Sequence, residues 1–79
     1  MKDSEMYPSE SMSIADKMLN DCLNAGLGFT ESISLSNLFI EEEVKRLKNL
    51  IGTTPANSHF FLLQVQKLEL ASKYLTLKL

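Results

Sequence analysis

The stretch Ile51-Gly52-Thr53-Thr54-Pro55 separates two long segments with helical apolar spacing, and it decides the predicted fold. Glycine is the preferred residue just after a helix ends, and threonine followed by proline is typical of a helix start. We therefore expect one helix to end at Gly52, with Thr54 as the N-cap and Pro55 in the first turn of the next helix. Because this link is short, the two helices must lie side by side and antiparallel.

The segment before the link is predicted to be a helix over residues 31–51. Thr30 is a good N-cap, and Ile33 can complete a hydrophobic staple with Phe29. The glutamates of the sequence EEEVKR, at 41–46, precede lysine and arginine by four residues, which marks an exposed face with the pairs Glu41–Lys45 and Glu42–Arg46. Apolar residues recur at the spacing of a packing seam, with Asn37 in one polar slot: Ile33, Ile40, Val44, Leu47 and Ile51.

The segment after the link, residues 55–77, is predicted to be a helix with two apolar seams on nearly opposite sides. The alternation of YLTLKL, residues 74–79, would also suit a strand, but a single strand has no partner, so helix is favoured. The first seam is interrupted once by Ser72 and contains Phe61, Val65, Leu68, Leu75 and Leu79. The second seam contains Phe60, Leu63, Leu70, Tyr74 and Leu77.

The register of the predicted hairpin follows from pairing the two seams outward from the link. This pairing puts Ile40 near Ser72, with Asn37 one step beyond. A buried amide without a partner costs roughly 1–3 kcal/mol, and a polar pair in an apolar seam can fix its register. We expect the side chains of Asn37 and Ser72 to lie within hydrogen-bonding or one-water distance.

The N-terminal part divides into a predicted mobile tail over residues 1–11 and a helix over 12–25. The tail, MKDSEMYPSES, has no apolar period. Gly26 and Gly28 end the helix. The sequence therefore predicts one all-α domain over residues 12–79, in which three helices are built on an antiparallel hairpin. The apolar face of the first helix contains Ile14, Ala15, Met18, Leu19, Cys22 and Leu23.

The second seam of the last helix has two interpretations. Helix 12–25 can cover it, which gives a self-contained bundle, or a different protein or a second copy can cover it. A chain of 79 residues buries only roughly 60% of its unfolded surface, so its core is marginal and a partner would help. We favour the partner, with these predicted anchors: Phe60, Leu63, Leu70, Tyr74 and Leu77.

The residue inventory gives no sign of an enzyme. Cys22 is the only cysteine and His59 the only histidine, which excludes an internal disulfide and falls short of the ligands that a structural zinc needs. Glu41, Glu42 and Glu43 are consecutive, so they lie on different sides of the helix and cannot converge on one metal ion. We expect no catalytic residue, cofactor, metal or small-molecule substrate.

Charge and hydropathy point to a protein-binding role in solution. The net charge of −2 comes with scattered basic residues, which disfavours direct nucleic-acid binding. No apolar run reaches the length of a signal or a membrane span. We expect a soluble cytoplasmic protein.

The segment PANSHFFLLQVQKLEL, residues 55–70, resembles the second half of small helical co-chaperones and needle subunits of type III secretion systems. In both, a turn with proline or small polar residues precedes a helix, and an aromatic or leucine pair precedes a glutamine. This resemblance implies a bacterial helical chaperone that docks to other proteins. The matching positions are Pro55, Asn57, Phe60, Leu63, Gln64, Leu68 or Leu70, and Tyr74.

The segment LNAGLGFTESISLSNLF, residues 23–39, is similar to the turn and following helix of the YmgB/AriR family of biofilm and stress connector proteins. The matching positions are Gly26, Phe29, Leu38 and Glu43, whereas Glu42 stands where the family has a leucine. This likeness implies a small regulatory connector that acts on a transcription or signalling factor. We expect a non-enzymatic helical adaptor or chaperone-like protein, with the regulatory connector as the alternative.

Overall fold

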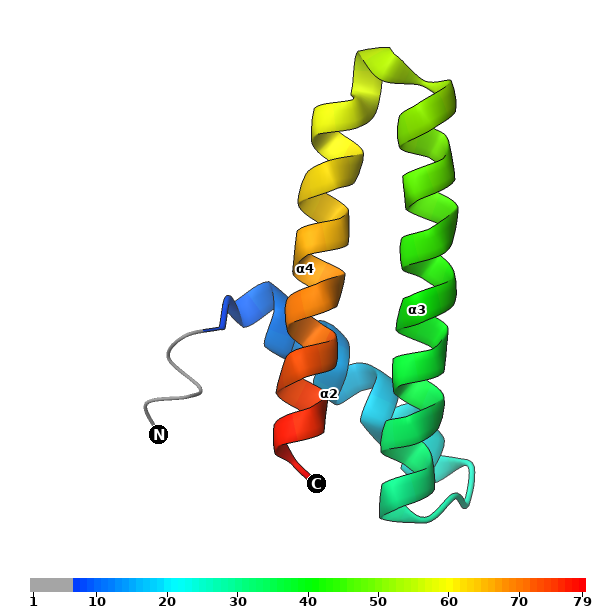
Figure 1. The fold of residues 1–79 in the computed structure, drawn as a ribbon. Coiled ribbons are helices and arrows are strands. Elements are labelled where there is room, and N and C mark those ends of the chain that lie inside the picture. The colour runs from blue at the N-terminus through cyan, green and yellow to red at the C-terminus, as the bar shows by residue number, and fades with distance from the viewer. Residues whose placement is uncertain (1–6) are drawn as a thin grey trace.

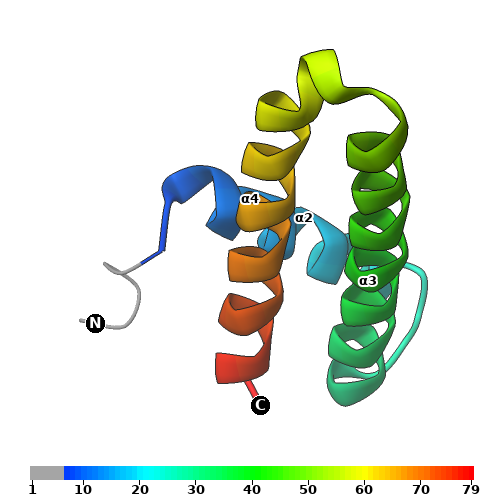
Figure 2. The same cartoon turned by 45° about the horizontal axis from the view of Figure 1, so that its top comes forward.

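The computed structural model describes residues 7–79, which form an all-α fold (Figure 1). Helix α2 spans Ser9–Asn24, α3 spans Phe29–Thr53 and α4 spans Ser58–Leu77, with a short 3-10 helix, η1, at Pro55–Asn57. Helices α3 and α4 run antiparallel and form a long hairpin, and α2 crosses behind one end of it (Figures 1 and 2). The predicted fold class is confirmed, and none of residues 7–79 is in a strand.

The hairpin is held by apolar side chains at the predicted seam positions. Ile33, Ile40 and Leu47 of α3 are buried, as are Val65 and Leu75 of α4. Residues that recur every three or four positions lie on one side of a helix, so these two rows can meet along the whole hairpin.

The expected polar pair is present within this seam. The hydroxyl of Ser72 donates a hydrogen bond to Oδ1 of Asn37 at 2.9 Å. The contact joins residues 35 positions apart and is partly buried. It confirms the predicted register of α3 against α4.

Helix α2 completes the core at one end of the hairpin only. Its Ala15 and Leu19 pack with Ile33, Ala71 and Leu75. The molecule measures 40 × 29 × 15 Å, and its radius of gyration is 13.4 Å, against about 11 Å for a compact domain of this length. The protein is therefore a thin plate with little interior.

The start of α2 differs from the prediction of a tail up to residue 11. The helix begins at Ser9, and Ser11 is fully buried because its hydroxyl donates a hydrogen bond to the backbone oxygen of Lys67 at 2.9 Å. Because this hydrogen bond joins residues 56 positions apart, no local pattern in the sequence predicts it. The rest of the predicted tail, residues 1–6, lies outside the described residues.

The end of α2 is built around Gly26, as predicted. Gly26 has φ of 97°, in the left-handed region that only glycine adopts freely. The amide of Leu27 donates to the oxygen of Cys22, and the amide of Gly26 donates to that of Leu23. This pair of bonds is the Schellman arrangement that closes a helix.

Helix α3 is longer at both ends than predicted. Its N-cap is Gly28, not Thr30, and the carboxylate of Glu31 accepts a hydrogen bond from the Gly28 amide at 3.3 Å. The helix continues through Gly52 to Thr53. The hydroxyl of Thr53 donates to the oxygen of Asn49 at 3.2 Å, so Gly52 lies within the last turn and does not end the helix.

The charged pairs on α3 also differ from the expected four-residue spacing. Lys45 lies 3.7 Å from Glu42, and Arg46 lies 2.6 Å from Glu43, both at a spacing of three. These side chains are well exposed, so the pairs contribute little to stability.

The last helix ends where predicted but starts later, because residues 55–57 form the 3-10 helix η1 and α4 begins at Ser58, with Asn57 and not Thr54 as its N-cap. Pro55 occupies the first position of η1, after Thr54. Helix α4 then extends to Leu77, which makes most of the YLTLKL segment helical.

Candidate protein-binding face on helix α4

The predicted anchors form a row on α4 outside the seam that meets α3, and we call this row the outer face. It comprises Phe60, Leu63, Leu70, Tyr74 and Leu77. At one end of the row, Phe60 also borders a hollow lined by Leu47 and Leu50 of α3. Phe60, Leu63 and Leu77 are 59%, 42% and 55% exposed, while Leu70 and Tyr74 are half-buried. A row of apolar side chains that are this exposed to solvent is typical of interaction sites.

Among the described residues, the N-terminal part of the chain covers the middle of the outer face, at Lys67 and Tyr74. The ring of Tyr7 lies 5.8 Å from that of Tyr74, centroid to centroid. The ammonium of Lys78 lies 4.6 Å from the centroid of the same ring and 3.8 Å from the carboxylate of Asp16. Tyr74 is thus fixed in place by its neighbours.

Helix α2 does not fill the second seam. It packs against Ala71 and Leu75, with Tyr74 at the edge of the same cluster, and Phe60, Leu63 and Leu77 remain exposed. Within residues 7–79, the chain therefore covers the second seam around Lys67 and Tyr74 and leaves Phe60, Leu63 and Leu77 exposed.

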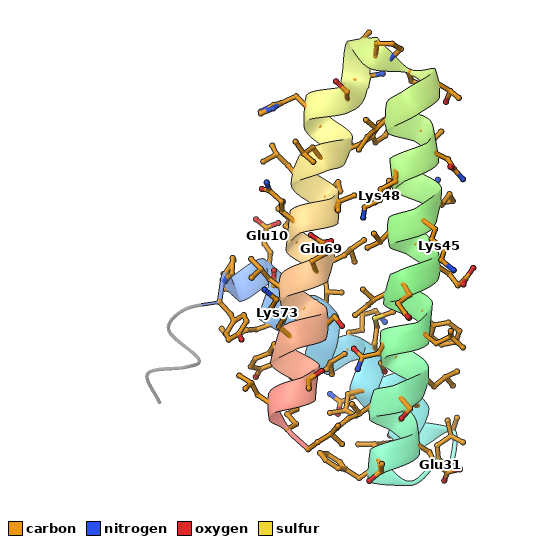
Figure 3. All side chains as sticks on the ribbon, in the orientation of Figure 1. Glu10, Glu31, Lys45, Lys48, Glu69 and Lys73 are labelled. Carbon is orange, nitrogen blue, oxygen red and sulfur yellow. The ribbon has the colours of Figure 1, made fainter. Side chains whose placement is uncertain are left out.

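Lys67 lies between the two halves of the outer face, and sequence reasoning missed its role. Its ammonium lies 2.7 Å from the carboxylate of Glu10, with the lysine side chain 32% exposed. Figure 3 places Glu10 beside α4. The available signal was the spacing: position 67 falls between Leu63 and Leu70 in the same row.

A second exposed apolar area, which the sequence analysis also missed, lies on α3. Leu38 and Phe39 are 51% and 50% exposed. Phe39 borders a shallow hollow of about 370 Å³ whose wall includes Met18, Cys22 and Leu35. The adjacent apolar pair at 38–39, outside the seam of α3, was the sequence signal.

The groove between α3 and α4 is charged around its edge. Ile40 and Val44 line a hollow of about 540 Å³. Lys45 and Lys48 from α3 and Glu69 and Lys73 from α4 line the same hollow (Figure 3). Because positive and negative side chains are mixed around this hollow, it does not favour the binding of either cations or anions.

The residues considered for catalysis are far apart along the fold. Cys22 is 7% exposed, and its sulfur lies 3.8 Å from the Ser36 hydroxyl. His59 is exposed at the start of α4, by the hairpin turn. Within residues 7–79, no group of three or more metal-binding side chains could hold a metal ion.

Glu43 and Arg46 form the best-aligned ion pair on the surface. The guanidinium donates hydrogen bonds to both carboxylate oxygens, at 2.9 and 2.6 Å. These bonds lower the pKa of Glu43 and raise the pKa of Arg46. The pair borders the groove near Leu47 and Phe61.

No protein-family model, characterised protein or solved structure matches the chain. Within the described residues, no helix combines the length and the apolar character needed to cross a membrane.

Proposed function

We propose that the protein is a non-enzymatic adaptor or chaperone-like protein that binds a protein partner through the outer face of α4. The supporting observation is the row of exposed apolar side chains on one side of a single helix. The resemblance of residues 55–70 to type III secretion co-chaperones supports the same kind of role.

The thinness of the molecule explains why this surface needs a partner. With an extent of 15 Å in its thinnest direction, the protein has one layer of contacts between the hairpin and α2. Helix α4 has apolar residues on two sides, and the described part of the chain covers the second side only around Lys67 and Tyr74. A partner groove that accepts an amphipathic helix would cover the remainder of it.

The strength of such binding can be bounded from the exposed fractions. Full burial of an exposed leucine or phenylalanine contributes roughly 1.5–3 kcal/mol. Since Phe60, Leu63 and Leu77 are about half exposed, each contributes roughly 1 kcal/mol on binding. Association costs at least about 4 kcal/mol, so the partner must contact the whole outer face, with Phe60 as the main aromatic anchor.

Site-specific photo-crosslinking in the cells that produce the protein tests this proposal. A photoreactive phenylalanine analogue replaces Leu63 on the outer face or, as a control, Leu62, which is similarly exposed at 48% but points about 100° away. We expect a defined protein adduct from position 63 and not from position 62.

A second variant checks that the adduct depends on the same surface. Leu70→Glu, combined with the probe at Leu63, should remove the adduct while circular dichroism remains helical. Equal labelling from both probe positions, or an adduct that survives Leu70→Glu, would rule out the outer face as the binding site.

A further inference from the structure

We propose that the start of α2 is an internal competitor, which covers the centre of the outer face and must be displaced before a partner binds there. The segment concerned is residues 7–11, which we call the N-terminal turn. This inference rests on the proposed function, because it concerns the regulation of the same surface.

The N-terminal turn lies on the middle of the row. The ring of Tyr7 packs on that of Tyr74, with centroids 5.8 Å apart. The carboxylate of Glu10 lies 2.7 Å from the ammonium of Lys67 (Figure 3). The hydroxyl of Ser11 donates a hydrogen bond to the backbone oxygen of Lys67 at 2.9 Å. A partner that packs along the row from end to end would occupy the same space as this turn.

The N-terminal turn can leave α4 without dismantling the core. The residues of α2 that belong to the buried core cluster are Ala15 and Leu19, and residues 7–11 lie outside that cluster. Ala15 is one helical turn beyond the end of the N-terminal turn. Release of residues 7–11 therefore unwinds only the first residues of α2 and leaves the rest of the helix packed.

The attachment of the N-terminal turn is weak. Pro8 is the N-cap of α2 and makes no side-chain cap hydrogen bond, although the first amides of a helix depend on such a cap or on water. The side chain of Glu10 is 68% exposed, and an ion pair this open to water adds little stability. When Ser11 is released, its hydroxyl bonds to water instead, so the net gain from its hydrogen bond is small.

Competition for one surface sets the closed turn and the bound partner against each other. The apparent affinity for a partner falls in proportion to the fraction of molecules in which the row is open. A change that weakens the N-terminal turn should therefore lower the stability of the free protein and strengthen binding. A turn with a purely structural role predicts the reverse, because a less stable protein would also bind less well.

Three variants move the N-terminal turn in known directions, and the photoreactive analogue at Leu63 reports binding in the producing cells. Glu10→Lys places a second ammonium beside Lys67 and should open the turn by repulsion. Tyr7→Ala removes the ring contact and should open it without a change of charge. Pro8→Asn supplies an uncharged N-cap side chain and should hold the turn closed.

We expect the yield of the photo-adduct to rise roughly threefold in both opening variants and to fall roughly twofold in Pro8→Asn. The melting temperature should move the other way, falling in the opening variants and rising slightly in Pro8→Asn, while circular dichroism remains helical. Asp21→Lys is the matched control, because it makes the same change of charge in another exposed ion pair of α2, with Lys17. It should leave the adduct yield unchanged.

The possible results separate the competitor from the proposed function. An adduct yield that ignores the opening variants, or that falls together with the melting temperature, would overturn the competitor and leave the proposed function standing. An adduct that forms only in the opening variants would support both. If no adduct forms at Leu63 in any variant, the outer face binds no partner and both proposals fail.

Discussion

The hydrogen bond between Ser72 and Asn37 offers a quantitative test of the hairpin register. Ser72→Ala removes the donor of the 2.9 Å bond and leaves the Asn37 oxygen in a half-buried seam. A net intramolecular hydrogen bond contributes about 0.5–1.5 kcal/mol, and a fully buried orphan costs more. Since water reaches these half-buried groups, we expect a loss near the middle of that range, about 1 kcal/mol.

Helix propensity works against this loss in the single variant. Alanine is more favourable than serine within a helix by up to about 0.7 kcal/mol. The measured change for Ser72→Ala alone should therefore be small. A double-mutant cycle with Asn37→Ala cancels the propensity change and isolates the coupling.

Urea and thermal denaturation of the wild type, both single variants and the double variant provide the cycle. We expect a coupling of about 1 kcal/mol, which corresponds to about 4–8 °C in melting temperature for a domain of this size. Ser34→Ala, at an exposed α3 position, serves as the control and should stabilise slightly. A coupling within about 0.3 kcal/mol of zero, the error of additivity, would refute the pairing.

Other changes address the helix ends, the N-terminal contact and acid stability. Gly26→Ala should lower the free energy of unfolding by about 1–2 kcal/mol because the φ of Gly26 is 97°. Gly52→Ala should raise it by about 0.5–1 kcal/mol because Gly52 lies in α3 with open space around it. Equal effects of the two changes in denaturation would contradict the two backbone assignments. Tyr7→Ala should lower stability by about 0.5–1.5 kcal/mol through the lost ring contact with Tyr74, and an unchanged melting temperature would show that the contact contributes nothing. The lowered pKa of Glu43 adds stability to the folded state above the usual glutamate pKa of about 4.3, and this stability is lost as the pH falls through the lowered pKa. Glu43→Gln should therefore lose slightly less stability in acid than the wild type does. An identical dependence of stability on pH in the two proteins would argue against the ion pair.

The hairpin could be predicted because its information is local and periodic. The row from Ile33 to Leu47 faces the row from Val65 to Leu75, and Pro55 marks the start of the second arm. These rows specified which sides meet and also the register, down to one hydrogen bond. Periodicity alone carries such information wherever two helices follow each other closely.

The placement of α2 depended on contacts that no local pattern records. Ser11, Ser32 and Ser36 are all fully buried, although serine usually marks an exposed position. Ser36 meets Cys22 across the α2–α3 contact, where small side chains let the helices approach closely. A pattern of apolar residues does not mark such positions, because side-chain size and not polarity decides which residue fits there.

The helix caps were misjudged for a related reason. Thr30 has the right chemistry for an N-cap, but Glu31 accepts the Gly28 amide and extends the helix upstream. Gly52 has the right chemistry for a stop, yet α3 continues to Thr53, whose hydroxyl donates to the Asn49 carbonyl one turn earlier. Competing hydrogen bonds within one or two turns decide where a helix begins and ends, and the helix propensities of single residues do not predict which of these bonds forms.

The position of α2 beneath the far end of α4 has a consequence for synthesis on the ribosome. Helix α2 emerges early, but the backbone oxygen that accepts the Ser11 hydrogen bond lies 56 residues later in the chain. At 5–20 residues per second, roughly 3–11 s pass before that partner exists. During this interval the apolar side of α2 can pack only on Ile33 and Ile40 of α3 and lacks Ala71 and Leu75 of α4. The core therefore stays incomplete until the last helix has been synthesised.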